Sequence, residues 1–193
     1  YFSDYFGVSE ELLEQYGAFN ISLVTDLPLF IDPFLLFNSD NQDYQDLHDD
    51  IIRYLRFLRT KSEQGGITPA LIRAWYCFSE VKQNWLGFSE MGNLGRGLGR
   101  NFARALDKNL VHVFKNFGTE QITSGSHLEK LCLIQSGVGR DMISDFTTNL
   151  IKDYLLSYTQ IFAQNHVSPD LVTAFSVNRA FFSYETERWM PKT

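Results

Sequence analysis

Apolar residues recur at intervals of three and four along several stretches of the chain, a spacing that predicts amphipathic helices. The most regular stretch runs from about residue 43 to residue 64 and is followed by two glycines, which are typical of a helix end. Another stripe consists of Phe102, Leu106, Leu110, Val113 and Phe117. A third stretch predicts one long helix from about residue 141 to residue 164.

Other helices are predicted by their start signals. Ser9 is followed by two glutamates, the usual order of a cap and an acidic first turn, and Gly17 ends that short helix. Thr68, followed by a proline, predicts the start of a helix through ALIRAWYCF. Ser126, with a glutamate three residues later, has the spacing of a capping box.

Two short segments near the N-terminus, FNISLV (19–24) and LPLFID (27–32), have the β-branched and aromatic composition of strands, and a turn between them would make a hairpin. Near the other end, AFFSYET (180–186) has a similar composition. We therefore predict an α+β fold that is predominantly α-helical, with about five helices and a small β-sheet or hairpin.

Composition and charge limit the class of protein. The 193 residues are 44% hydrophobic and 15% aromatic, which is enough to bury a core, so we expect residues 1–193 to form a single domain. The formal net charge of −6 excludes a globally basic nucleic-acid coat but leaves room for a local basic face. Cys77 and Cys132 each lie in an apolar run, so we expect buried free thiols and a cytoplasmic location.

No signal-peptide pattern and no apolar run long enough to cross a bilayer occurs in the sequence, so no membrane partner is expected. The chain begins at Tyr1 rather than at methionine, and it ends shortly after a strand-like segment. We interpret it as a fragment, the N-terminal part of a longer protein.

The segment MGNLGRGLGRNFARALDKNL (91–110) places four glycines directly before a predicted helix. Glycine lets the backbone approach a ligand closely, and the free amides and the dipole at a helix start favour an anion. Arginines spaced by four would add a basic ridge. The candidate anion-binding residues are Gly95, Arg96, Gly97, Gly99, Arg100 and Arg104. A tight turn before a solvent-exposed helix face explains the same residues, and no P-loop Gly-Lys-Ser/Thr ends the run.

A Glu-x-Lys pair lies in FSEVKQNWLG (78–87). On a strand, Glu80 and Lys82 point the same way, so Glu80 can ligate a metal ion while Lys82 positions or activates a water molecule. Restriction-type nucleases combine such a pair with an upstream aspartate, and Asp32, at the end of the predicted strand, would take that part. Asp32, Glu80 and Lys82 are therefore candidate catalytic residues, with Mg²⁺ held by Asp32 and Glu80. The alternative is an exposed surface pair.

A second glycine turn, in SGVGRDMISDF (136–146), precedes the long predicted helix. Asp141 and Asp145 are four residues apart and share one helix face, which permits joint coordination of a metal ion. With Arg140 they form a secondary candidate polar site. A structural role explains them equally, because aspartates in a first turn stabilise the helix dipole and Asp141 can act as the cap.

Two segments, EVKQNWLGFSEMGNLGRGLG (80–99) and GSHLEKLCLIQSGVGRDMISDFTTNLIKDYLLSYTQ (125–160), resemble a group of longer, uncharacterised bacterial proteins. The resemblance covers most of the chain. It implies no activity, because no established reaction or catalytic residue belongs to that group.

Three functions are compatible with these features. The first is a protein that acts on DNA or RNA, with phosphate contacts from the Gly/Arg segment and a metal-dependent nuclease step. The second is a non-catalytic helical domain that binds another protein, or the missing part of its own chain, through an apolar patch around Tyr154 and Tyr158. The third is an enzyme that binds a small-molecule phosphate or nucleotide in a deep pocket beside the glycines. Whether the protein is an enzyme stays open.

Overall fold

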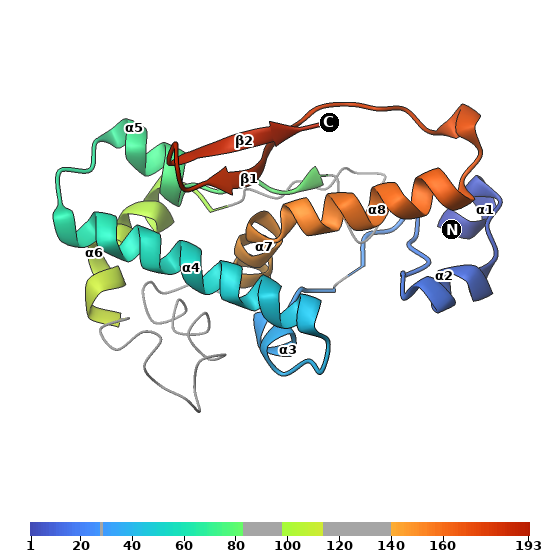
Figure 1. Cartoon of the computed structure of the whole chain (residues 1–193), viewed down its shortest axis with the longest axis horizontal. Coiled ribbons are helices and arrows are strands. Elements are labelled where there is room, and N and C mark those ends of the chain that lie inside the picture. The colour runs from blue at the N-terminus through green and yellow to red at the C-terminus, as the bar shows by residue number, and fades with distance from the viewer. Residues whose placement is uncertain (28, 83–97, 114–139) are drawn as a thin grey trace.

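A computed structural model describes residues 1–27, 29–82, 98–113 and 140–193 (Figure 1). In these ranges the chain forms eight α-helices and one two-stranded antiparallel sheet. The prediction of a predominantly helical chain with a small hairpin is confirmed, whereas the number of helices is larger than the five predicted. The prediction of a single domain stays a prediction.

The elements follow one another in a simple order along the chain. The α-helices are α1 (Phe2–Phe6), α2 (Glu10–Tyr16), α3 (Pro33–Phe37), α4 (Gln42–Gln64), α5 (Pro69–Leu71), α6 (Arg100–Val113), α7 (Arg140–Leu150) and α8 (Lys152–His166). A π-helical turn continues α5 and a 3₁₀ turn follows α8; these are η1 (Ile72–Tyr76) and η5 (Pro169–Leu171). The strands are β1 (Val177–Ser183) and β2 (Arg188–Lys192).

The predicted helix starts are confirmed where the structure describes them. The hydroxyl of Ser9 accepts a hydrogen bond from the Leu12 amide at 3.1 Å, and Gly17 takes the left-handed conformation, with φ of +77°, that ends α2. The hydroxyl of Thr68 accepts from the Leu71 amide at 3.3 Å and begins α5. The helix predicted from Ser126 lies outside the described residues.

The predicted N-terminal hairpin is wrong, because the described residues of 19–24 and 27–32 contain no strand. The hydroxyl of Ser22 accepts hydrogen bonds from the amides of Val24 and Thr25, at 3.2 and 2.9 Å, which closes a local turn. The Ile31 amide donates to the hydroxyl of Ser144 on α7 at 2.9 Å instead of to a strand. Within the described ranges, this segment of strand-like composition therefore has no partner strand with which to pair.

The long helix predicted over residues 141–164 is also wrong, because Ile151 (φ −97°, ψ 12°) separates α7 from α8. Figure 1 shows the two helices at an angle to each other. Before the break, the hydroxyls of Thr147 and Thr148 donate to the carbonyls four residues earlier, both at 2.7 Å. Such back-bonding commonly bends a helix.

The strand predicted at 180–186 is confirmed for residues 180–183, which belong to β1, whereas residues 184–186 form a turn, and β2 was not predicted. The strands pair with Phe182 opposite Trp189, and the register shifts between Val177 and Phe181. In that interval β1 advances four residues while β2 advances two, and Arg179, within the irregularity, has a φ of +55°. Figure 1 shows the hairpin on one side of α4, α7 and α8.

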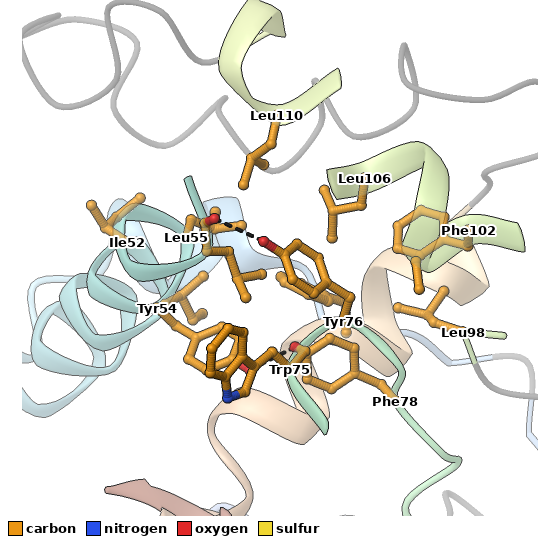
Figure 2. Close-up of a cluster of buried hydrophobic side chains, with 14 of the residues drawn as sticks. Ile52, Tyr54, Leu55, Trp75, Tyr76, Phe78, Leu98, Phe102, Leu106 and Leu110 are labelled. Atoms are coloured by element: carbon orange, nitrogen blue, oxygen red, sulfur yellow. Dashed lines mark hydrogen bonds between the residues drawn. The ribbon is translucent and has the colours of Figure 1, made fainter. Parts of the chain in front are cut away.

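The main hydrophobic core lies where α4, η1 and α6 meet. Figure 2 shows their side chains pointing toward one another. The predicted stripe of α6 is confirmed for Phe102, Leu106 and Leu110, which are all buried, whereas the side chain of Val113 and all of Phe117 lie outside the described part. Two buried tyrosines have backbone partners within this core. The hydroxyl of Tyr54 donates to the Trp75 carbonyl at 2.7 Å, and that of Tyr76 donates to the Leu58 carbonyl at 2.9 Å.

A smaller cluster joins the N-terminal helices α1 and α2 to the C-terminal half of α8 (Figure 1). Its buried members are Val8, Leu13, Phe162 and Val167. This packing ties the N-terminal helices to α8.

Candidate anion-binding site

The beginning of α6 and the exposed side of η1 border a pocket of about 380 Å³. Its described lining consists of Ile67, Pro69, Ile72, Arg73, Arg100, Arg104 and Asp107. Two of these arginines, Arg100 and Arg104, are among the residues that the sequence suggested for anion binding. The third, Arg73, was not predicted.

The packing of α6 explains why the three arginines meet. Phe102 and Leu106 are buried in the core, so Arg100 and Arg104 stand one turn apart on the exposed side of the helix. On η1 the buried residue Trp75 faces the same core, and Arg73 is exposed. We call Arg73, Arg100 and Arg104 the arginine cluster.

Within the described part of the chain, no hydrogen bond or ion pair engages any guanidinium group of the arginine cluster. The described lining contains one carboxylate, that of Asp107, and Asp107 already accepts a hydrogen bond from the hydroxyl of Ser62 at 2.8 Å. Three positive charges against one negative charge make this pocket attractive to an anion.

Gly99 directly precedes α6, and its carbonyl accepts the Ala103 amide at 3.0 Å. A Cβ atom placed on Gly99 would meet nothing within 4 Å, so packing does not require glycine at this position. Gly95, Arg96 and Gly97, which were predicted to bind the same anion, lie outside the described residues.

Asp32 caps α3. Its Oδ1 atom accepts a hydrogen bond from the Phe34 amide at 2.9 Å, and a proline follows at the first helical position. The prediction that Asp32 ends a strand is therefore wrong, because the preceding residues form none. Its carboxylate therefore has a structural role as a helix cap. The order Asp-Pro in the sequence is typical of such a helix start.

The prediction that Glu80 and Lys82 lie on one strand is wrong as well. The ladder is limited to a single bridge, in which Phe78 and Leu98 exchange two backbone hydrogen bonds of 3.2 and 2.7 Å. One residue later, the Ser79 carbonyl accepts from the side-chain amide of Asn149 on α7 at 2.8 Å. A helix side chain thus takes the place of a partner strand, so the alternation that would align Glu80 with Lys82 does not apply.

Glu80 instead lies near the acidic face of α7, which the sequence did not predict. Burial, followed by the negative charges of Asp141 and Glu80, raises the pKa of Asp145 to about 6. The side chain of Arg140, the first residue of α7, is outside the described part. Glu80, from one predicted site, therefore lies near Asp145, from another, whereas Asp32 does not join them.

No group of three or more histidine, cysteine, aspartate or glutamate residues that could hold a metal ion occurs among the described residues. The prediction of Mg²⁺ at Asp32 and Glu80 stays a prediction. Cys77 is a free, half-buried thiol, as predicted, and burial raises its pKa, whereas Cys132 lies outside the described ranges.

Arg73 is the functional candidate that the sequence reasoning missed. The signal was present, because Thr68 and its proline fix the start of the helix and Trp75 marks its buried side. The sequence alone does not show that η1 lies against α6, because this contact depends on the core that both elements share with α4.

The fold and the site define a mainly helical structure with an arginine cluster beside a pocket, and the described residues supply this cluster with no ion pair. None of the described helices is long and apolar enough to cross a membrane. The chain belongs to the family called domain of unknown function DUF8370, whose family model matches residues 7–193. No curated protein and no solved structure matches the chain.

Proposed function

We propose that this domain binds nucleic acid through phosphate groups held at the arginine cluster. The observation that carries the proposal is the meeting of Arg73, Arg100 and Arg104 around one pocket of about 380 Å³ without an ion pair among the described residues. Arginine presents a planar set of donors that matches phosphate oxygens in pairs. Because no acidic partner among the described residues must first be displaced, this part of the chain leaves the cluster ready to receive a phosphate.

Charge supports a local contact rather than a wide basic surface. The chain has a formal net charge of −6, so most of its surface repels a polyanion. Phosphates would be attracted only where the arginine cluster dominates. We include Gly95, Arg96 and Gly97 in the proposed site because they precede α6 in the sequence.

Cleavage of the bound strand by Asp32, Glu80 and Lys82 with Mg²⁺ has less support. Asp32 is engaged as the cap of α3, and Glu80 lies near Asp141 and Asp145 instead. We therefore propose binding and assign no reaction.

A protein-interaction domain is the second candidate function. Its support is an apolar pocket of about 410 Å³ between α1, α2, α8 and the segment after η5, bordered by Phe19 and Phe175, which are 66% and 60% exposed. Tyr158, one of the two residues around which the sequence predicted an apolar patch, lines this pocket, whereas Tyr154, the other, does not.

Binding to labelled DNA and RNA across a salt series tests the proposal. Arg100→Ala/Arg104→Ala should lower the affinity, and each lost phosphate contact should reduce the slope of log affinity against log salt by about 0.9 for duplex and about 0.7 for single strands. The control, Arg56→Ala/Arg188→Ala, removes the same formal charge from exposed positions of α4 and β2 that line neither the pocket of the arginine cluster nor the pocket beside the hairpin. Equal losses in both double variants, or no binding by the wild type, would contradict phosphate binding at α6.

A further inference from the structure

A second pocket, of about 460 Å³, lies between α4, the junction of α7 with α8, and the β1–β2 hairpin. Its volume falls within the range of about 300–1,000 Å³ that is usual for small-molecule sites. The arginine cluster does not line it. Its described wall is partly aromatic and partly polar, and the two parts are contributed by different elements.

The aromatic part is a set of rings that hold one another in place. Phe182 has its ring centroid 4.9 Å from that of Tyr54, 5.1 Å from that of Tyr184 and 5.4 Å from that of Trp189. Tyr154, on α8, lines the same pocket. These rings meet edge to face, so they fix one another and offer a preformed aromatic wall at a small cost in side-chain entropy.

The polar part is balanced in charge. Arg53 places its guanidinium carbon 4.0 Å from the centroid of the Tyr184 ring, and its positive charge acts on Asp50 on the same helix. Asp153 forms an ion pair with Lys192. With each carboxylate matched by a cation, the wall offers donors and acceptors without a strong preference for a charged ligand.

We infer that this pocket holds an unpaired nucleobase, stacked on the aromatic wall and hydrogen-bonded at its edge by Asp50 and Arg53. A base is flat, uncharged and edged with donors and acceptors, which are the properties that this wall complements. An organic cation would meet the positive charge of Arg53, and an apolar ligand would make no use of the donors and acceptors of Asp50 and Arg53. The inference rests on the proposed function and specifies single strands, since paired bases are not free to enter a pocket.

The test compares two single-stranded oligonucleotides of equal length, one with bases and one built from abasic sites, by fluorescence anisotropy. Tyr184→Leu keeps an apolar side chain but removes the ring. It should weaken binding of the base-bearing strand by about fivefold to 150-fold, the usual effect of losing one stacked base, and leave the abasic strand unaffected. Asp50→Ala, a second variant at an exposed position, should weaken only the base-bearing strand.

The control is Tyr5→Leu, which removes a ring that is 66% exposed on α1 and does not line the pocket. It should bind both strands as the wild type does. Arg100→Ala/Arg104→Ala should weaken both strands alike, which separates phosphate binding from base binding. Thermal unfolding of each variant identifies any loss that comes from misfolding.

Several results would overturn the base pocket. If the wild type binds both strands equally, or if Tyr184→Leu and Tyr5→Leu have equal effects, bases do not enter it, and phosphate binding can still stand. If the wild type binds neither strand, the proposed function fails. In that case an NMR titration with adenosine and cytidine, which carry no phosphate, tests the pocket separately. Chemical-shift changes that disappear in Tyr184→Leu support the pocket, and the absence of such changes at millimolar nucleoside overturns it.

Discussion

Tyr16 and Tyr158 form a reciprocal pair in which each phenol donates a hydrogen bond to the backbone carbonyl of the other residue. The Tyr16 hydroxyl lies 2.7 Å from the Tyr158 carbonyl oxygen, and the Tyr158 hydroxyl lies 2.9 Å from the Tyr16 carbonyl oxygen. The two ring centroids are 4.6 Å apart. This pair fastens the end of α2 to the middle of α8.

Removing either hydroxyl should weaken that attachment. We expect Tyr16→Phe and Tyr158→Phe each to lower the free energy of unfolding by about 0.5–1.5 kcal/mol, because each leaves a partly buried carbonyl without its donor. Urea denaturation measures the change. Tyr5→Phe, at an exposed position on α1, is the matched control and should have no measurable effect. If the two pair variants behave like this control, the hydrogen bonds do not stabilise the fold.

Asp32 has two competing roles, as a helix cap and as a metal ligand. If its contribution is capping, Asp32→Ala should cost about 0.5–2 kcal/mol of stability, while Asp32→Asn, which keeps an acceptor for the Phe34 amide, should cost little. Thermal unfolding with and without Mg²⁺ checks this. A stabilisation by Mg²⁺ that disappears in both variants would instead support the metal site.

Local signals in the sequence were sufficient for the ends of most helices. The acceptor side chains of Ser9 and Thr68 and the glycine at position 17 act on amides and carbonyls within one turn, so a short segment specifies the outcome. The apolar stripe of α6 was predictable for the same reason, since its period belongs to one element.

The errors arose where a segment depends on distant partners. Residues 19–32 have strand composition, but Ile31 binds Ser144 on α7, and no strand of the described ranges pairs with the segment. Conversely, β2 contains Pro191 and charged residues, so its composition does not predict a strand. Proline is acceptable there because both strands of a two-stranded hairpin are edge strands.

The candidate sites divide in the same way. Arg100 and Arg104 were identifiable because they lie one turn apart on one helix. The approach of Arg73 to them, and of Glu80 to Asp145, depends on packing between elements that are far apart in the sequence. The spacing of residues within one segment does not predict contacts between such distant elements.

The position of Asp145 predicts a pH-dependent stability. Its folded-state pKa of about 6 is raised above the ordinary value of 3.8, so the neutral form stabilises the fold at low pH, and this contribution is lost as the pH rises from about 4 to about 6. Asp145→Asn should therefore exceed the wild type in stability at pH 7 by up to about 3 kcal/mol and match it near pH 4. Denaturation at both pH values measures this, with Asp170→Asn at an exposed position as the control. An equal difference at both pH values would show that Asp145 does not titrate in this range.

Lys152 gives the opposite pH dependence. It is only 4% exposed, and burial, followed by the positive charge of Arg179, lowers its pKa to about 8. A lowered pKa means that the folded state resists protonation, so the stability due to this group increases as the pH rises from about 8 to about 10.5. At pH 7 the charged ammonium opposes folding.

Lys152→Met keeps the length of the side chain and removes the charge, so it should raise the free energy of unfolding at pH 7 by about 2–3 kcal/mol. The gain should shrink at pH 9.5, where Lys152 of the wild type is neutral in the folded state. Lys108→Met, at an exposed position of α6, should change stability little at either pH. A loss of stability in Lys152→Met at pH 7 would contradict this prediction. It would mean that the charged ammonium stabilises the fold, which requires a hydrogen-bond acceptor beside it at this buried position.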